Sequence, residues 1–184
     1  MIIRQAKIED SKEISTLLLL ASEEVIYGFI QEENSEKANQ LMQHFTAQPA
    51  NQYSYENCWV AEEDHLIIGA VAIYDGANLQ SLREPVKIYV EEKFGVPFNP
   101  EDETQEGELY IDSLGVRADQ QGKGIGAQIL QFLIDKYVKS EGKVLGLLVD
   151  KDNPLAKKLY VKLGFKIVSE KTLVGKELEH LQIG

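Results

Sequence analysis

One stretch sets the interpretation of this chain: Val116-Arg117-Ala118-Asp119-Gln120-Gln121-Gly122-Lys123-Gly124-Ile125-Gly126-Ala127. It leads from a strand-like segment directly into a helix, and glycine takes three of five consecutive positions. Glycine lets the backbone approach a ligand without an intervening Cβ. The first turn of a helix also has N–H groups without an intrahelical partner, at the positive end of the helix dipole. The stretch therefore predicts a phosphate-binding loop, with a tight turn as the plain structural alternative.

Strand and helix signals continue on both sides of this loop. The segment from Glu108 to Val116 has the composition of a strand, and the apolar residues from Gly124 to Ser140 step by four as in a helix. The nearly continuous apolar run from Val144 to Val149 is typical of a strand covered on both faces. Asn153 is then a natural N-cap, with Pro154 at the first helical position. These signals predict a strand–helix–strand unit at the centre of the fold.

The first half of the chain predicts two helices and a hairpin, and the end of the chain predicts two closing strands. Strands are expected at Ile2–Ile8, Trp59–Ala61, Leu66–Tyr74, Phe165–Val168 and Leu178–Ile183, and helices from Asp10 to Gly28 and from about Ser35. The 184 residues suit one domain, so we expect a single mixed α/β domain over residues 1–184.

The segment 83–107 interrupts this order as an insert between the hairpin and the following strand. It contains Pro85, Pro97 and Pro100 and ends in an acidic run at residues 101–103. A short helix is expected at Lys87–Phe94, with loop on either side. A long connection in a compact domain is usually functional or disordered.

Charge and composition exclude several classes of protein. The 19 Lys and Arg residues against 30 Asp and Glu give a net charge of -11, and such a field repels nucleic acid. No apolar stretch is long enough for a membrane span or a signal sequence. Cys58, the only cysteine, is expected to be a buried core residue, and the three histidines (His44, His65 and His180) show no metal-ligand spacing. We expect a cytoplasmic protein without a metal, a nucleic-acid partner or a membrane partner.

The loop sequence by itself does not determine which phosphate-containing ligand binds. Gly122-x-Gly124-x-x-Ala127 also fits the dinucleotide fingerprint, so an oxidoreductase is one alternative. Too few residues follow the loop for a doubly wound domain, and a hairpin precedes it. A nucleoside-triphosphate P-loop is excluded because Gly-Lys-Ser and Gly-Lys-Thr are absent.

Two motifs resemble those of the GNAT (Gcn5-related N-acetyltransferase) superfamily. Gln121-x-x-Gly124-x-Gly126 resembles its motif A. Its motif B resembles Asn153-x-x-Ala156-x-x-Leu159-Tyr160-x-x-Leu163-Gly164-Phe165. The resemblance covers nearly the whole chain, with segment 83–107 as the main departure. It implies an α/β (α+β) GNAT fold, in which a mixed central sheet contains a splayed parallel strand pair and has helices on both faces.

The resemblance also implies roles for individual residues. Backbone groups at Leu114, Gly115 and Val116 would bind the pantetheine arm of coenzyme A, and the N–H of Leu114 would polarise the thioester carbonyl. The loop from Gln121 to Ala127 would hold the pyrophosphate, with added charge from Lys123. Asn153 would bind the pantetheine arm as well as cap its helix. Tyr160 would protonate the departing thiolate, and its alternative role is that of a residue at the edge of the core.

The general base has two candidates. Glu108, Tyr110 and Asp112 alternate along one strand and should share a face if the strand is regular. Some family members place a glutamate base at the position of Glu108, whereas Asp112 lies nearer to the expected thioester. Each could instead be a solvated carboxylate at a sheet edge, and many GNAT enzymes use an ordered water molecule.

The function implied by the resemblance is transfer of an acetyl group from acetyl-CoA to a primary amine of a small molecule, peptide or protein, by direct attack in a ternary complex. A non-catalytic acyl-CoA-binding module is the alternative, with the dinucleotide-binding oxidoreductase behind it. No metal is implied, and a homodimer is compatible with the family. The acidic run Glu101-Asp102-Glu103 would wall the acceptor pocket and favour a cationic amine.

Overall fold

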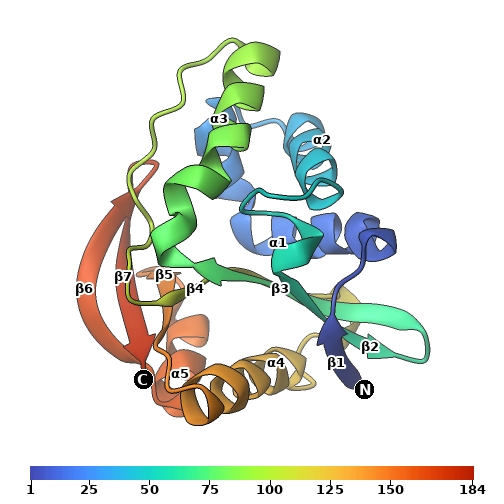
Figure 1. The fold of residues 1–184 in the computed structure, drawn as a ribbon, viewed down its shortest axis with the longest axis vertical. Helices are drawn as coiled ribbons and strands as arrows, with labels where there is room; N and C mark the ends of the chain where they lie inside the picture. The colour runs from blue at the N-terminus through green and yellow to red at the C-terminus, as the bar shows by residue number, and fades with distance from the viewer.

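The computed structural model describes all residues from 1 to 184. A seven-stranded sheet in the order β1-β2-β3-β4-β5-β7-β6 separates two layers of helices (Figure 1). The strands are Ile2–Gln5 (β1), Cys58–Glu63 (β2), Leu66–Asp75 (β3), Leu109–Val116 (β4), Leu145–Asp150 (β5), Lys166–Leu173 (β6) and Lys176–Ile183 (β7). The helices are Ser11–Ile30 (α1), Ser35–Thr46 (α2), Leu79–Phe94 (α3), Ile125–Leu133 (α4) and Pro154–Leu163 (α5).

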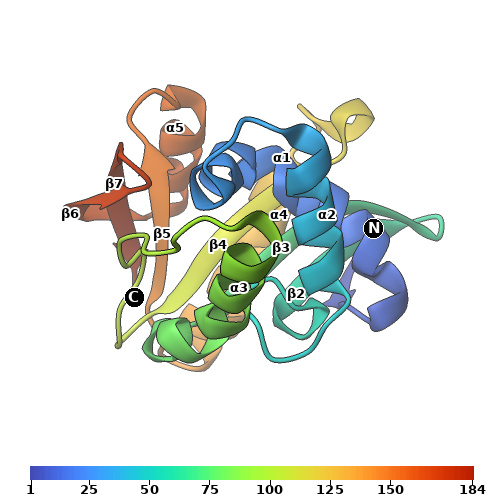
Figure 2. The ribbon, with the colours of Figure 1, turned by 90° about the horizontal axis from the view of Figure 1, so that it is seen from above.

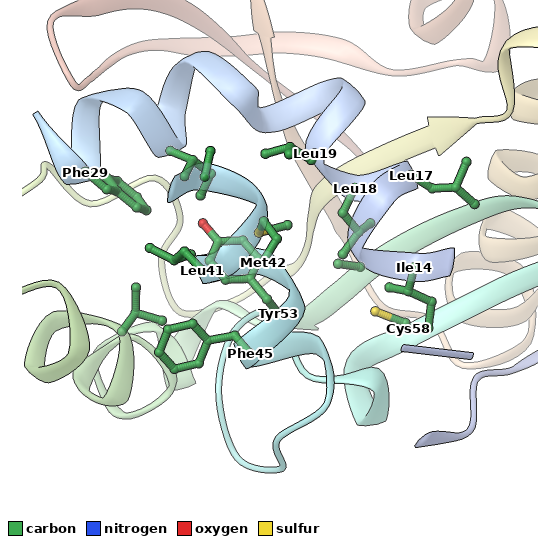
Figure 3. Close-up of a cluster of buried hydrophobic side chains, with 14 of the residues drawn as sticks. Ile14, Leu17, Leu18, Leu19, Phe29, Leu41, Met42, Phe45, Tyr53 and Cys58 are labelled. Atoms are coloured by element: carbon green, nitrogen blue, oxygen red, sulfur yellow. The ribbon is translucent and has the colours of Figure 1, made fainter. Parts of the chain in front are cut away.

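The layer of α1, α2 and α3 contains the larger apolar core. Tyr53 lies among Leu41 and Met42 of α2, and Cys58 lies beside Ile14 of α1 (Figure 3). Cys58 is fully buried, and burial raises the pKa of its thiol, so its interpretation as a core residue is confirmed. None of the helices combines the length and apolar character needed to cross a bilayer.

The opposite layer consists of α4 and α5. Ile129 and Leu133 of α4 are fully buried against the sheet, as their spacing predicted, and Leu130 is buried beside them. The helix continues beyond Leu133 as a π-helical segment, Ile134–Ser140, so the predicted extent to Ser140 is confirmed with a change of hydrogen-bond pattern near its end.

Segment 83–107 differs from the expectation. The short helix predicted at residues 87–94 is the second half of α3, which has 16 residues and contains Pro85. The buried positions Leu79, Arg83, Val86 and Val90 step by three or four along one face. Their packing on the core outweighs the hydrogen bond that proline removes from the helix. Only the residues after Phe94 form the predicted loop, which runs down beside β7 and β5 (Figures 1 and 2).

The strands β4 and β5 are the only parallel neighbours, and they separate early. They pair at Leu109–Leu145, Tyr110–Gly146 and Ile111–Leu147 and not beyond, although both strands continue. The predicted splayed pair in a mixed sheet is therefore confirmed. A bulge accompanies the separation: Ala72 of β3 pairs with Ser113 and Ile73 pairs with Ile111, which leaves Asp112 without a partner.

Candidate active site

The loop before α4 presents a row of free backbone donors. No N–H group from Gly122 to Ala127 donates to another group of the chain. Gly122 and Gly124 have φ angles of 76° and 80°, which a residue with a Cβ rarely adopts. Both glycines are exposed, so a ligand can approach. The row of free donors at a helix start is suited to an anion with several oxygens.

Side chains at the same loop fix its shape. Gln121 donates from Nε2 to the carbonyl oxygen of Val116 at 3.1 Å, which ties the loop to the end of β4. Lys123 donates to Oε1 of Gln120 at 2.9 Å and remains exposed. Gln121 therefore orders the loop, and Lys123 lies where it can add positive charge.

The gap between β4 and β5 opens next to this loop. The N–H of Arg117 donates to Ile68 of β3 at 3.0 Å. Since neighbouring residues of a strand direct their polar groups to opposite sides, those of Leu114 and Val116 face away from β3 and into the gap. A Cβ at Gly126 of α4 would lie 3.5 Å from the side chain of Leu114, so the loop and the gap adjoin.

Gly115 has a different reason to be glycine. A Cβ at this position would lie 1.8 Å from the carbonyl oxygen of Leu17, so the absence of a side chain lets α1 cross directly over β4. The predicted role of Gly115 in ligand binding stays a prediction, and its packing role is evident from the geometry.

Two predicted residues lie on α5, on the same side of the sheet as α4. Asn153 accepts a hydrogen bond at Oδ1 from the N–H of Ala156 at 3.1 Å, so it caps the helix, while its amide nitrogen has no partner. The ring of Tyr160 packs edge-on to Phe165 with centroids 6.0 Å apart, and its hydroxyl has no hydrogen-bond partner in the chain. Burial raises the pKa of Tyr160, which keeps the phenol protonated at neutral pH. The residue can therefore act as a proton donor.

Glu108 lies in a fully enclosed set of hydrogen bonds just before β4. Its Oε2 accepts from His180 at 2.8 Å and from Gln182 at 2.7 Å, and its Oε1 accepts from Thr104 at 2.7 Å. Burial alone would raise the pKa of Glu108, but these hydrogen bonds outweigh it and hold the pKa below the usual value. The residue is 3% exposed, and Oε2 fills the space above Gly146. This geometry gives Glu108 a structural task and leaves it poorly placed to contact a substrate.

We expect Glu108→Gln to destabilise the protein by about 1–3 kcal/mol, because the new amide N–H₂ replaces an acceptor that faces His180 and Gln182. Urea unfolding at pH 7 measures the loss. Because its folded-state pKa is lowered, Glu108 stabilises the fold above its unfolded-state pKa, and this contribution falls away in acid. The gap in stability between wild type and variant should therefore narrow below about pH 4. An equal gap at all pH values would contradict the assignment.

Asp112 lies at the bulge of β4 on the face covered by α1 and α3. Its Oδ1 accepts from the hydroxyl of Ser113 at 2.7 Å, and its Oδ2 lies 3.2 Å from the hydroxyl of Tyr74 and 3.4 Å from Nε2 of Gln52. Burial and the nearby carboxylate of Glu103 raise the pKa of Asp112 to about 7, against the opposing effect of its hydrogen bonds. The residue is half-buried, without a salt-bridge partner, and can gain or lose a proton near neutral pH.

The acidic run at residues 101–103 differs from its expected role. Glu101 accepts from the N–H of Val174 in the β6–β7 turn at 2.9 Å, Asp102 accepts from Gln80, and Glu103 is buried against Arg83. These carboxylates tie the loop to α3 and to the β6–β7 hairpin. They do not form a free acidic wall.

The candidate site comprises the loop before α4 and the stretch where β4 and β5 no longer pair. Two cavities of about 330 and 530 Å³ lie elsewhere, one at the end of α1 beside the β6–β7 turn and the other between α2 and α3. Neither is lined by residues 122–127, by Tyr160 or by Asp112. The loop and Tyr160 belong to the α4–α5 side of the sheet and Asp112 to the other side, so a ligand that reached both would have to pass between β4 and β5.

The sequence interpretation missed several neighbours of Asp112. Gln52 precedes β2, Tyr74 lies on β3, and Arg83 and Glu103 lie at the two ends of segment 83–107, so no spacing in the sequence links the four. The one available signal was a buried-type helical spacing that included Arg83, which is unusual for an arginine unless it is paired.

The chain as a whole is similar to known proteins. A model of the acetyltransferase (GNAT) family matches residues 23–165. A crystal structure of an acetyltransferase is 33% identical, covers 99% of this chain and 98% of its own, and superposes with a TM-score of 0.79. An N-acetyltransferase from Staphylococcus aureus Mu50 is 21% identical over 100% of both chains, with a TM-score of 0.84. The protein yncA from Salmonella typhimurium, solved with its cofactor acetyl-CoA, is 17% identical, with 100% and 92% of the chains covered and a TM-score of 0.55. No curated protein matches the chain.

Proposed function

Because this chain belongs to the GNAT family of acetyltransferases, we propose that it transfers an acetyl group from acetyl-CoA to a primary amine by direct attack within a ternary complex. One observation carries the proposal: the free N–H groups from Gly122 to Ala127 adjoin the gap between β4 and β5. The dinucleotide alternative needs a doubly wound parallel sheet, and here β4 and β5 are the only parallel pair.

The residues present suit acetyl-CoA, which supplies the acetyl group as a thioester. The N–H groups of residues 122–127 would hold the diphosphate, and Lys123 would add charge. The polar backbone groups of Leu114 and Val116 would bind the pantetheine arm, as would the free amide nitrogen of Asn153. The N–H of Leu114 would donate to the carbonyl oxygen as negative charge develops on it.

Two side chains would move the protons. Asp112 would accept a proton from the acceptor nitrogen, directly or through one water molecule, and Tyr160 would donate a proton to the departing sulfur. Asp112 is preferred over Glu108 because Glu108 is enclosed by three hydrogen bonds. Tyr160 and Asp112 lie on opposite faces of the sheet, so the acyl donor would enter from the α4–α5 side and the amine from the α1–α3 side.

A small amine as the acetyl acceptor is compatible with the activity named for a protein of the same fold. An agmatine N-acetyltransferase with 15% identity and a TM-score of 0.60 covers 98% of its own chain in the match. The amine accepted by the present chain would meet the half-buried carboxylate of Asp112, which attracts a cationic group once it is ionised. A panel of diamines, amino acids and peptides with acetyl-CoA, followed by thiol release and mass spectrometry of products, identifies it.

Binding tests the proposal before any acceptor is known. Calorimetry and thermal shift should detect coenzyme A and acetyl-CoA, and NAD should give neither heat nor stabilisation. Absence of binding by both forms of coenzyme A would end the proposal, whatever the acceptor.

The variant Gly124→Val should lose about tenfold or more in coenzyme A affinity, because a β-branched residue resists the φ of 80° at the start of α4. Gly142→Val is the matched control: Gly142 has a φ of 65°, has open space around its Cβ position, and lies at the far end of the same helical segment. Calorimetry should show weakened binding for the first variant alone. Equal affinities would mean that the loop does not hold the diphosphate.

A further inference from the structure

Asp112 is one end of a buried polar chain that reaches back into the protein. The hydroxyl of Tyr74 lies 3.2 Å from Oδ2 of Asp112 and 3.2 Å from Oε1 of Glu103. Nε2 of Gln52 lies 3.4 Å and 3.2 Å from the same two oxygens. Arg83 of α3 closes the chain, with its Nη2 2.9 Å from Oε1 of Glu103. All of these residues except Asp112 are at most 5% exposed.

The two carboxylates are not equivalent. Glu103 forms a buried salt bridge with Arg83, whereas Asp112 has no cation in contact. The hydroxyl of Tyr74 has a single hydrogen and lies at the same distance from both acceptors, so it can donate to one carboxylate at a time. Two neighbouring carboxylates in a poorly solvated place resist being ionised together. The carboxylate without a cation, Asp112, is therefore the member of the pair that takes up a proton.

We propose that Glu103, anchored by Arg83, and Tyr74 are positioning residues that prepare Asp112 to accept the proton of the acceptor amine. This inference rests on the proposed function. As the nitrogen–carbon bond forms and the carbon–sulfur bond breaks, the proton leaves the nitrogen and binds a carboxylate oxygen of Asp112. The hydrogen of Tyr74 then turns to Glu103. No heavy atom has to move, so Asp112 is positioned to accept the proton before the reaction begins.

The β-bulge at Asp112 orients the unit formed by Asp112, Tyr74, Glu103 and Arg83. Asp112 is the unpaired residue of β4, and its side chain contacts Tyr74 and Gln52. Further along the strand, Leu114 and Val116 turn their backbone groups into the gap. The segment 83–107 supplies both Arg83 and Glu103, so it contributes to the candidate site although the family motifs lie elsewhere. The titratable groups that face Asp112 are Glu103, Tyr53, Tyr74, Tyr110 and Cys58, and Arg83 lies behind Glu103.

Titration of the Asp112 carboxyl tests the unit without any need for turnover. The side-chain carboxyl carbons of aspartate are labelled with carbon-13 and followed by NMR from pH 4 to pH 9, and the signal missing from Asp112→Asn identifies Asp112. In the wild type the midpoint is expected at about pH 7. In Glu103→Gln it should fall by about one pH unit or more, because a like charge is lost and the positive charge of Arg83 is no longer neutralised. The new side chain keeps an oxygen for Arg83.

Tyr74→Phe should move the same midpoint in the opposite direction, upwards by about half a pH unit, because the ionised carboxylate loses a hydrogen bond. Tyr110→Phe is the matched control. Its ring packs against that of Tyr74 with centroids 5.7 Å apart and is equally buried, and its hydroxyl makes no hydrogen bond to Asp112. That variant should leave the midpoint unchanged.

Kinetics then show whether the unit serves the reaction. The acidic limb of kcat/KM should follow each midpoint, downwards in Glu103→Gln and upwards in Tyr74→Phe, with the KM for acetyl-CoA unchanged. Equal midpoints in the wild type and Glu103→Gln, or equal effects of the two Tyr→Phe changes, would overturn the inference. If Glu103→Gln fails to fold, the comparison of Tyr74→Phe with Tyr110→Phe decides alone. Opposite shifts in a protein that does not bind acetyl-CoA would refute the proposed function and leave the link between Asp112 and Glu103 intact.

Discussion

Asp112→Asn is expected to lower kcat/KM for the amine by about 10²-fold or more at pH 8, with acetyl-CoA affinity unchanged, because the variant cannot accept the proton of the acceptor. Asparagine has nearly the same shape: its oxygen can still accept a hydrogen bond from Tyr74, and its amide nitrogen, in the place of Oδ1, can donate to the hydroxyl oxygen of Ser113. Steady-state kinetics with varied amine, together with calorimetry of acetyl-CoA, measure the two quantities. Glu108→Gln should retain activity within a few-fold when folded, so the pair of variants decides between the two candidate bases.

The pH dependence of kcat/KM distinguishes loss of the base from a change in packing, because only loss of the base removes the acidic limb of the profile. In the wild type, kcat/KM should rise about tenfold per pH unit below about pH 7 and then level off, since Asp112 must be ionised. The variant should lack that limb. A wild-type profile without an inflection near pH 7, or a variant that keeps it, would assign the limb to another group.

The same substitution is expected to stabilise the fold. The pKa of Asp112 is raised on folding from 3.8 to about 7, so its contribution to stability is complete below its unfolded-state pKa and is lost as pH rises through the folded value. At pH 8 an ionised Asp112 is therefore unfavourable, and Asp112→Asn should gain on the order of 1–3 kcal/mol, with no gain at pH 4. Urea unfolding at both pH values measures this. Loss of activity combined with gain of stability would mark the residue as functional.

Tyr160→Phe is expected to lower kcat by about 10²-fold while the dissociation constant of coenzyme A changes less than threefold, because the phenol contributes a proton late in the reaction and little to binding. Its hydroxyl has no partner in the chain, so its removal leaves no unpaired buried group behind. Single-turnover kinetics and calorimetry check the two values.

Tyr55→Phe is the control for Tyr160, since Tyr55 is also half-buried and its hydroxyl also lacks a hydrogen bond in the chain. It should match the wild type in both measurements. If Tyr160→Phe kept full kcat, water or another group would be the proton donor. If it lost coenzyme A affinity in proportion to kcat, the ring would be part of the binding surface.

The phosphate loop and the strand–helix–strand unit were predictable because their signals are local. A glycine at positive φ, an N-cap at Asn153 and a continuous apolar strand each reflect the chemistry of a few neighbouring residues. The helix α3 was only half predicted, because Pro85 indicates a helix boundary while the burial of Val86 and Val90 favours continuation. Such a conflict is settled by packing against distant residues.

The surroundings of the Glu108 and Asp112 carboxylates could not be predicted from local sequence patterns. The alternation of Glu108 and Asp112 indicated one shared face, and both do lie on the α1–α3 side. Their environments differ because His180 and Gln182 of β7 enclose one, while a bulge and Tyr74 of β3 surround the other. These partners are 38 to 74 positions away in the chain. Only the folded sheet shows which carboxylate is free.

The early separation of β4 and β5 has a mechanical consequence. Within the sheet, the N-terminal part of the molecule is joined to the C-terminal hairpin by only three residue pairs between these strands. Spontaneous opening of the ligand-free protein should therefore start along this seam, and amide hydrogen exchange should be fastest there among the central strands. A ligand bound between the strands would contact both halves of the sheet, so ligand binding would also stabilise the protein against opening along this seam.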